Sequence, residues 1–257
     1  RKNSGNFHRF KLHSRMAYYL SEIPRKIVYY YWLVKLFFAR KKNRSRFSVI
    51  IPAYQRAHII ERALKSIYSQ KFIQPEDIEI IVINDGSTDN IEHILKEHPS
   101  VVFLNETHSG VIGQVRNKGL LSAKNEFIAY LDSDDYWLPI HLALHEYTYR
   151  KNPELAFIST RATCEHLDFS SGTCKVIRKL NPPFKSYPVT NAVTHKRECF
   201  LKLGGFDDTL FGEDQIFWNK IKSDYPHKHL KVKTTIYTFT KNGNNITYSF
   251  HPDSEIK

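Results

Sequence analysis

Cysteine is scarce in this chain of 257 residues, and long apolar runs are missing. Its three cysteines, Cys164, Cys174 and Cys199, are too few for a disulfide framework and lack the spacing of a zinc site, so we expect a reducing compartment. The longest uncharged run near the N-terminus, Ile27 to Val34, is far shorter than the ~18 residues of a membrane-spanning helix. The chain also has no P-loop or Gly-x-Gly-x-x-Gly motif, which excludes the usual nucleoside-triphosphate and dinucleotide cradles.

What the chain has in excess is positive charge, and this charge lies at one end. It carries 38 Lys and Arg against 26 Asp and Glu. Residues 1–46 hold 13 of the basic residues and one acid, Glu22, which leaves 25 basic and 25 acidic residues in the rest of the chain. A nucleic-acid-binding fold carries basic residues on its own surface. Because residues 47–257 are electrically balanced, we expect no nucleic-acid partner; the alternative is nucleic-acid binding through the basic residues of 1–46.

The N-terminal arm, residues 1–46, combines this charge with aromatic side chains. Ser21 and Pro24 suit the start of a helix, and Tyr29 to Trp32 with Phe37 and Phe38 lie between clusters of Lys and Arg. This composition is typical of a helix in the headgroup layer of an anionic membrane, where each Lys or Arg contributes about 1 kcal/mol. The alternative is a helix packed on the main domain with a solvated basic tail. We favour the membrane surface, on the cytoplasmic side.

Strand-like and helix-like patterns alternate from residue 47 onward. Apolar runs rich in β-branched residues predict buried strands, at 47–51, 78–83, 101–104 and 127–131. Helical spacing of apolar residues predicts helices between and after them, at 60–70, 88–98, 110–124 and 137–150. The alternation indicates an α/β fold with a Rossmann-like, mostly parallel sheet, helices on both faces, and ligands at the carboxyl ends of the strands.

The pattern becomes irregular after a strand expected at 155–160. We expect a hairpin that turns near 170–172, followed by helical patches and a final strand. These last elements are placed at 196–203, 214–223 and 230–240. The irregular half is expected to hold the acceptor.

Acidic residues follow two of the expected parallel strands. Asp85 ends the second strand, and Asp132, Asp134 and Asp135 follow the fourth. Carboxyl ends of parallel strands meet at one edge of a sheet, so the two groups should lie close together. Three carboxylates in four residues repel one another unless a cation is near, and oxygen ligands suit Mg²⁺ or Mn²⁺ bound to a diphosphate. The alternative is an acidic cap on the following helix.

A third acidic group, Glu213 and Asp214, follows Gly212 and precedes an apolar stretch that contains Trp218. Paired carboxylates at the start of a helix can simply complement its dipole. They can also supply a general base, in which one carboxylate takes a hydroxyl proton while the other, or Trp218, shapes its surroundings.

Six motifs, in their order along the chain, resemble glycosyltransferase family 2. They are Val-Ile-Ile-Pro-Ala-Tyr, Asn-Asp-Gly-Ser-Thr-Asp, Val-Arg-Asn-Lys-Gly-Leu, Leu-Asp-Ser-Asp-Asp, Gly-Gly-Phe-Asp and Gly-Glu-Asp-x-x-Phe-Trp. The resemblance covers residues 47–240 but not the arm. It implies the GT-A fold, with a nucleotide-sugar half at 47–135 and an acceptor half at 136–257, and an inverting reaction. No Gln-x-x-Arg-Trp signature follows Asp214, so a processive synthase is not expected.

The resemblance also implies a role for particular residues. It assigns the nucleotide to Pro52, Tyr54, Asp85, Arg116, Asp132 and Ser133. The divalent metal, Mn²⁺ or Mg²⁺, would be bound by Asp134. Asp214 would be the general base, with Glu213 beside it. The diphosphate or acceptor would be approached by His195, Lys196 and Trp218.

The expected activity is transfer of a sugar from UDP to a hydroxyl of a glycan or lipid-linked acceptor. The basic arm and the habits of the family suggest a bacterial surface polysaccharide, such as O-antigen, capsule or lipooligosaccharide. We expect the protein on the inner face of the cell membrane. The alternative is a catalytically silent sugar-nucleotide-binding or scaffold protein.

Overall fold

The computed structural model describes residues 25–39, 45–168, 175–180 and 188–240. It divides the chain into two compact units, Arg1–Arg40 and Lys41–Lys257. The helix expected in the arm is present in the first unit as α2 (Arg25–Phe38). Within the described residues, every helix is too short or too polar to cross a membrane.

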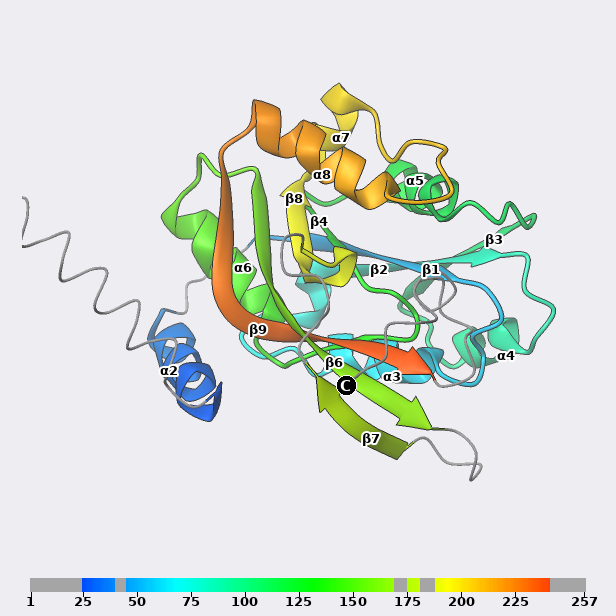
Figure 1. Ribbon diagram of the computed structural model, residues 1–257, viewed down its shortest axis with the longest axis horizontal. Coiled ribbons are helices and arrows are strands. Elements are labelled where there is room, and N and C mark those ends of the chain that lie inside the picture. The colour runs from blue at the N-terminus through cyan, green and yellow to red at the C-terminus, as the bar shows by residue number, and fades with distance from the viewer. Residues whose placement is uncertain (1–24, 40–44, 169–174, 181–187, 241–257) are drawn as a thin grey trace, which may run out of the picture. The chain divides into compact units, whose positions relative to one another are not determined.

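The second unit is built on one nine-stranded sheet, in the order β3-β2-β1-β4-β8-β6-β9-β5, with β7 paired to β6 (Figure 1). Its first four strands are parallel and confirm the expected ones. They are β1 (Phe47–Ala53), β2 (Ile78–Asp85), β3 (Val101–Glu106) and β4 (Phe127–Tyr130). Every residue of β1 is buried, as its continuous apolar run predicts for a central strand covered on both faces.

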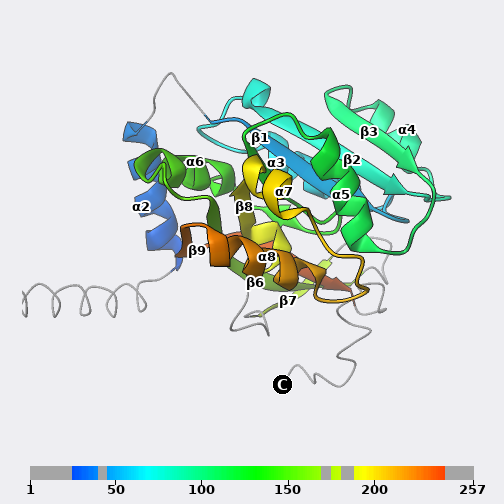
Figure 2. The ribbon, with the colours of Figure 1, turned by 90° about the horizontal axis from the view of Figure 1, so that it is seen from above.

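The helices of this half lie on opposite faces of the sheet. The chain moves outward from β1 to β3 through α3 (Ile60–Tyr68) and α4 (Ile91–Lys96), and then returns to β4 through α5 (Ile112–Ser122). Because parallel crossovers are right-handed, reversing direction places α5 on the other face (Figures 1 and 2). The reversal makes β1 and β4 a topological switch point, where ligands of α/β sheets bind.

Helix α5 packs unusually close to the sheet at Gly119. A Cβ atom there would lie 2.6 Å from Ile50 Cγ2 and 2.8 Å from Ile83 Cδ1, closer than real side chains approach. Only glycine fits this position without moving core side chains of β1 and β2. The close approach fixes the height of α5 above the strands, and so the position of the side chains that α5 directs to their ends.

The second half of the sheet is mixed. The long strands β6 (Phe157–Asp168) and β9 (His227–Thr240) are parallel to each other, whereas β8 (Val193–Lys196) is antiparallel to both β4 and β6. Strand β7 (Lys175–Leu180) forms the expected hairpin with β6, and its predicted turn at 170–172 lies outside the described residues.

Expected boundaries shift in this half: β6 starts two residues after the expected 155 and continues to Asp168, and β9 starts three residues before the expected 230. The helix expected from Trp137 starts later, as α6 (His141–Lys151), because β5 (Tyr136–Trp137) pairs with β9. The helical patch expected from Lys196 begins one residue later, as α7 (Arg197–Leu203), after the unexpected strand β8. A single-turn 3₁₀ helix, η2 (Thr190–Ala192), leads into β8, and another, η1 (Pro75–Asp77), precedes β2.

Helix α8 (Glu213–Asp224) is held to the sheet by aromatic side chains. Phe217 and Trp218 are buried, with ring centroids 5.0 to 5.6 Å from those of Phe206, Tyr130 and Phe157. Burying aromatic side chains of this size contributes a large share of the stability of any core. This packing presents the first turn of α8 to the carboxyl edge of β4.

Candidate active site

The turns that follow β1 and β2 are bonded to each other at the carboxyl edge of the sheet. The Gln55 amide donates to Ser87 Oγ at 2.9 Å, and the Ala57 amide donates to Asp89 Oδ2 at 2.7 Å. Gln55 adopts a left-handed conformation, with φ of 54°, which turns the chain back across the strand ends. The ends of β1 and β2 therefore form one surface.

Asp85, at the end of β2, is held by the loop before α5. Its Oδ1 accepts from the amide and the hydroxyl of Ser109 at 2.8 and 3.0 Å, and its Oδ2 accepts from the Gly110 amide at 3.2 Å. His108 Nδ1 lies 2.8 Å from Oδ2, and its ring stacks on Tyr54 at 4.1 Å. A further ligand would reach the Asp85 carboxylate by replacing one of these donors, of which His108, with a side chain 46% exposed, and Gly110 lie at the surface.

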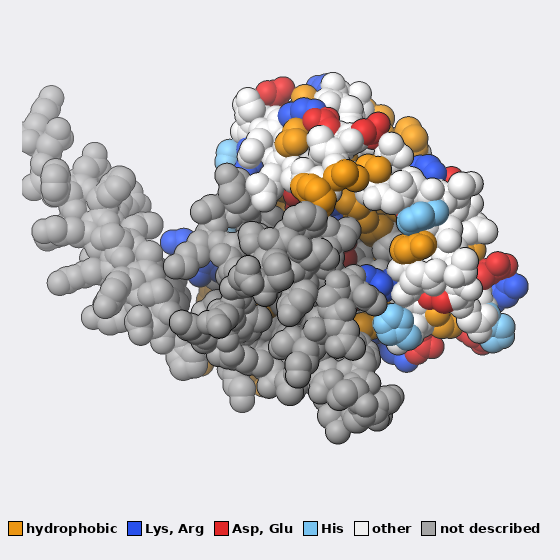
Figure 3. Space-filling view, turned by 45° about the vertical axis from the view of Figure 1, so that its right-hand side comes forward, with side chains coloured by type: hydrophobic (Ala, Val, Ile, Leu, Met, Phe, Trp, Pro, Cys, Tyr) orange, Lys and Arg blue, Asp and Glu red, His pale blue; other side chains and the backbone are white. Residues whose placement is uncertain are grey.

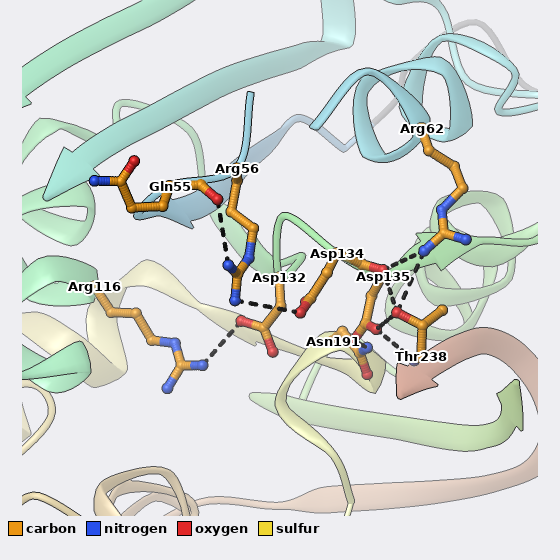
Figure 4. Close-up of polar contacts among 9 residues, drawn as sticks. All are labelled: Gln55, Arg56, Arg62, Arg116, Asp132, Asp134, Asp135, Asn191 and Thr238. Atoms are coloured by element: carbon orange, nitrogen blue, oxygen red, sulfur yellow. Dashed lines mark hydrogen bonds and ion pairs between the residues drawn. The ribbon is translucent and has the colours of Figure 1, made fainter. Parts of the chain in front are cut away.

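The three carboxylates after β4 point in different directions (Figure 4). Asp132 faces Arg116, with Oδ1 3.0 Å from Nη2, and Asp134 faces Arg56, with Oδ2 3.8 Å from Nη2. Asp135 turns into the protein, where it accepts from the Thr238 amide at 2.7 Å and from the Asn191 amide group. Asp132 and Asp134 therefore face the open edge, whereas Asp135 ties β9 and η2 to the end of β4.

The surroundings of this cluster disfavour the ionised form of two of its carboxylates. Burial raises the pKa of Asp134 to about 6, and Asp132 adds to the shift while Arg56 opposes it. Burial, together with Asp134 and Asp132, raises the pKa of Asp135 well above its ordinary value. A cation beside Asp134 would favour its charged form. The described residues contain no group of three or more protein side chains that could hold a metal.

Arg116, on α5, joins two acidic groups that are far apart in the sequence. Its Nη1 donates to Glu213 Oε1 at 2.7 Å and its Nη2 to Asp132 Oδ1 at 3.0 Å. The residue is 5% exposed. Burial by itself lowers the pKa of Arg116, but Asp132, Glu213 and Asp214 outweigh it and raise the pKa above its ordinary value. Arg116 therefore stays positively charged, and it connects the end of β4 to the first turn of α8 through two ion pairs.

Glu213 and Asp214 have different surroundings although they are adjacent. Glu213 is buried against Arg116, and burial raises its pKa against the effect of that cation. Asp214 is half-buried, with Oδ2 accepting from Thr190 Oγ1 at 2.7 Å and Oδ1 accepting from the Gln215 amide at 2.7 Å. Of the two, Asp214 is the carboxylate that a ligand at the edge can reach.

Three expected site residues lie elsewhere, which corrects their assignment to a loop near the diphosphate or acceptor. His195 and Lys196 are on strand β8, where they pair with Ile128 and Phe127, at the amino end of β4 and away from the acidic edge. His195 is fully buried, which lowers its pKa to about 4, and Lys196 Nζ donates to the Pro153 carbonyl at 2.8 Å. Trp218 is 1% exposed and belongs to the core.

The remaining expected residues lie near the edge. Tyr54 is exposed beside His108, whereas Pro52 and Ser133 are buried in β1 and directly after β4. Residues that the sequence reasoning missed also contact the site: Arg56, Arg62, Thr190, Asn191 and Thr238. Arg62 donates to the carbonyl of Asp134. Of these five residues, only Arg56 could have been predicted from the sequence, because it lies just after the first predicted strand.

Solved structures share this architecture. TarS residues 1–349 of Staphylococcus aureus, in complex with UDP-GlcNAc, matches with a TM-score of 0.63 at 22% identity, over 76% of this chain and 58% of that one. The mannosyltransferase PcManGT of Pyrobaculum calidifontis, in complex with GDP-Man and Mn²⁺, matches with a TM-score of 0.63 at 20% identity, over 84% and 65%. The second unit therefore has the expected fold of a GT-A glycosyltransferase.

The sequence identifies the family. Residues 48–197, more than half of the chain, match glycosyl transferase family 2, and the chain belongs to this family. A Campylobacter jejuni relative, GalNAc(5)-diNAcBac-PP-undecaprenol beta-1,3-glucosyltransferase, is 36% identical over 95 residues, which are 35% of this chain. This match spans 30% of the Campylobacter jejuni protein, and a separate match of the chain to TarS spans 16% of TarS.

Replacing Arg116 should strongly destabilise the protein. Arg116→Met leaves Glu213 and Asp132 without their buried partner, and breaking a buried ion pair costs about 3 kcal/mol or more. Urea denaturation measures the loss. Lys220→Met is the matched control, because Lys220 pairs with Asp207 at the surface and surface pairs contribute ~1 kcal/mol or less. Equal losses for the two variants would contradict the bridging role of Arg116.

Proposed function

We propose that this chain transfers a sugar from a UDP-sugar to a hydroxyl group of a glycan or lipid-linked acceptor, with inversion, in the synthesis of a bacterial surface polysaccharide. The proposal rests on one observation. Arg116 binds both Asp132, after β4, and Glu213, in the first turn of α8, so the acidic residues after β4 and the reachable carboxylate of Asp214 share one edge.

The donor is proposed to lie across the ends of β1, β2 and β4. Tyr54, exposed and stacked on His108, offers its ring to a base, and Asp85 can accept from a base N–H that displaces His108. Asp132, on the same edge, would accept from ribose hydroxyls, because its side chain is 25% exposed even while paired with Arg116. The TarS structure with UDP-GlcNAc, which shares the fold, supports a UDP-sugar.

Asp134 is proposed to hold a divalent metal, Mn²⁺ or Mg²⁺. Burial disfavours the charged form of Asp134, and a bound cation would favour it. A single carboxylate suffices because these ions keep waters and take further ligands from the diphosphate. When bound, such a metal compensates the charge that develops on the departing diphosphate. Arg56, whose guanidinium already faces Asp134, is placed to add positive charge at the same point.

Asp214 is proposed as the general base. It accepts the proton of the acceptor hydroxyl while that oxygen forms a bond to the anomeric carbon and the bond to the diphosphate oxygen breaks. A single displacement from the opposite face inverts the configuration. Glu213 stays with Arg116 and keeps the first turn of α8 in place.

Asp214→Asn should abolish transfer and leave UDP binding intact. The amide keeps the shape of the side chain but does not take a proton, and removing a general base costs at least ~100-fold in rate. We would measure UDP released from UDP-glucose, UDP-galactose and their N-acetylated forms with Mn²⁺, and UDP binding by calorimetry. Asp224→Asn, on the exposed end of the same helix, is the control.

Equal loss of binding and transfer in Asp214→Asn would remove Asp214 from the base role. Wild-type protein that binds UDP but releases none from any of these donors, with or without manganese, would instead favour the silent binding or scaffold protein.

Asp134→Ala should weaken UDP binding in the presence of Mn²⁺ and leave the weaker metal-free binding nearly unchanged. The reason is that the substitution removes the proposed metal ligand without touching the proposed base site. Calorimetric titrations of UDP at several Mn²⁺ concentrations give the comparison, with exposed Asp224→Ala as control. An unchanged dependence on manganese would exclude Asp134 as the ligand.

The arm is proposed to hold the protein at an anionic membrane surface, the inner face of the cell membrane, where a lipid-linked acceptor is found. In Figure 3, acidic and basic side chains of the second unit are interspersed around a patch of hydrophobic side chains. The net positive charge lies in residues 1–46 instead. An isolated basic segment with aromatic neighbours binds anionic headgroups without changing the surface of the catalytic unit.

Neutralising four basic residues of the arm should reduce binding to anionic vesicles. At about 1 kcal/mol per residue, the loss is about 100-fold or more. The variant changes Arg40, Lys41, Lys42 and Arg44 to Gln, and its control changes four exposed lysines of the second unit, Lys71, Lys96, Lys151 and Lys228. Sedimentation with phosphatidylcholine vesicles, with and without phosphatidylglycerol, measures binding. Similar losses in both variants would contradict a specific role for the arm.

A further inference from the structure

Thr190 contacts the proposed base directly, although it lies 24 residues away in the sequence. Its Oγ1 donates to Asp214 Oδ2 at 2.7 Å, and the residue is buried. The other oxygen, Oδ1, accepts from the Gln215 amide, within the first turn of α8. The carboxylate is therefore held from two sides, by its own helix and by η2.

The turn η2 that carries Thr190 is fixed by several other elements. The carbonyl of Asn191 accepts from Trp137 Nε1 at 2.7 Å and from Thr235 Oγ1 at 3.0 Å. The carbonyl of Ala192 accepts from Thr160 Oγ1 at 3.3 Å. These donors come from β5, β9 and β6, so three strands of the mixed half of the sheet hold the backbone of η2.

The same turn also contacts the acidic cluster after β4. The side chain of Asn191 donates to Asp135, which in turn accepts from the Thr238 amide at 2.7 Å (Figure 4). Adjacent residues of η2 thus contact the cluster that carries the proposed metal ligand and the helix that carries the proposed base. No other described contact joins Asp214 to the mixed half of the sheet as directly as Thr190 does.

We infer that Thr190 is a positioning residue, which fixes the direction of the Asp214 carboxylate toward the acceptor hydroxyl. The inference rests on the proposed function. A carboxylate on the first turn of a helix rotates about two side-chain torsions, and a second donor from a rigid turn selects one orientation. Because proton transfer needs the base within hydrogen-bond reach of the hydroxyl, loss of this donor slows the chemical step without weakening donor binding.

The test replaces the hydroxyl of Thr190 at constant volume. Thr190→Val should lower kcat for UDP release from the best UDP-sugar by about tenfold to a hundredfold, with donor KM and UDP affinity unchanged. Thr190→Ser keeps the hydroxyl and should retain most of the wild-type rate. Thr148→Val is the matched control, because Thr148 is also buried but donates to the Leu144 carbonyl within α6, at 2.7 Å.

Each outcome separates this inference from the proposed function. A wild-type rate in Thr190→Val, or a Thr190→Ser rate as low as that of Thr190→Val, overturns the positioning role while the proposed function stands. A loss of UDP affinity and of thermal stability in both variants, in proportion to the loss of kcat, also overturns it, because Thr190 would then be only structural. Absence of transfer by the wild-type protein with every UDP-sugar removes the proposed function and this inference with it.

Discussion

The candidate site depends on one buried cation. Arg116 pairs with Asp132 from the parallel half of the sheet and with Glu213 from the helix of the mixed half. Two carboxylates brought this close without a cation would repel each other and would lose hydration. The neighbouring residue, Asn117, adds a second connection, since its side chain donates to the Phe206 carbonyl and accepts from the Phe206 amide, at 2.8 and 2.9 Å. One turn of α5 thereby sets the separation of the two halves.

Three aspartates in four residues have separate tasks because their side chains meet different neighbours. Asp135 is fully paired inside the protein, Asp132 is paired with Arg116 at the rim, and Asp134 faces Arg56 across a longer distance. Treating them as one acidic cluster hides this difference. The carboxylate that faces Arg56 is the one proposed to hold a metal.

The parallel half of the fold could be predicted from the sequence, but the contacts around the site could not. The apolar runs of β1 to β4 are local signals, and the alternation with helices fixed the edge where Asp85 and Asp132 lie. Strand β8 has only four residues and gives no such signal, so the motifs predict His195 and Lys196 in a loop near the diphosphate or acceptor, whereas they lie in a strand. The motif predicts Trp218 as a site residue, but a motif does not indicate burial, and Trp218 lies in the core. Thr190 and Asn191 were missed because their partners are 24 and 56 residues away.

The pairing of β6 with β9 has a consequence for how the chain acquires its structure during synthesis. These neighbours are parallel, with β7, β8, α7 and α8 between them in sequence, so the pairing closes a long loop. The four parallel strands, in contrast, are complete once Tyr130 has left the ribosome. Asp135 accepts a hydrogen bond from the backbone amide of Thr238, which lies near the end of the described residues. In the nascent protein, Asp135 therefore lacks this hydrogen bond until β9 has been synthesised. The acidic residues after β4 reach their final arrangement only after β9 has paired with β6.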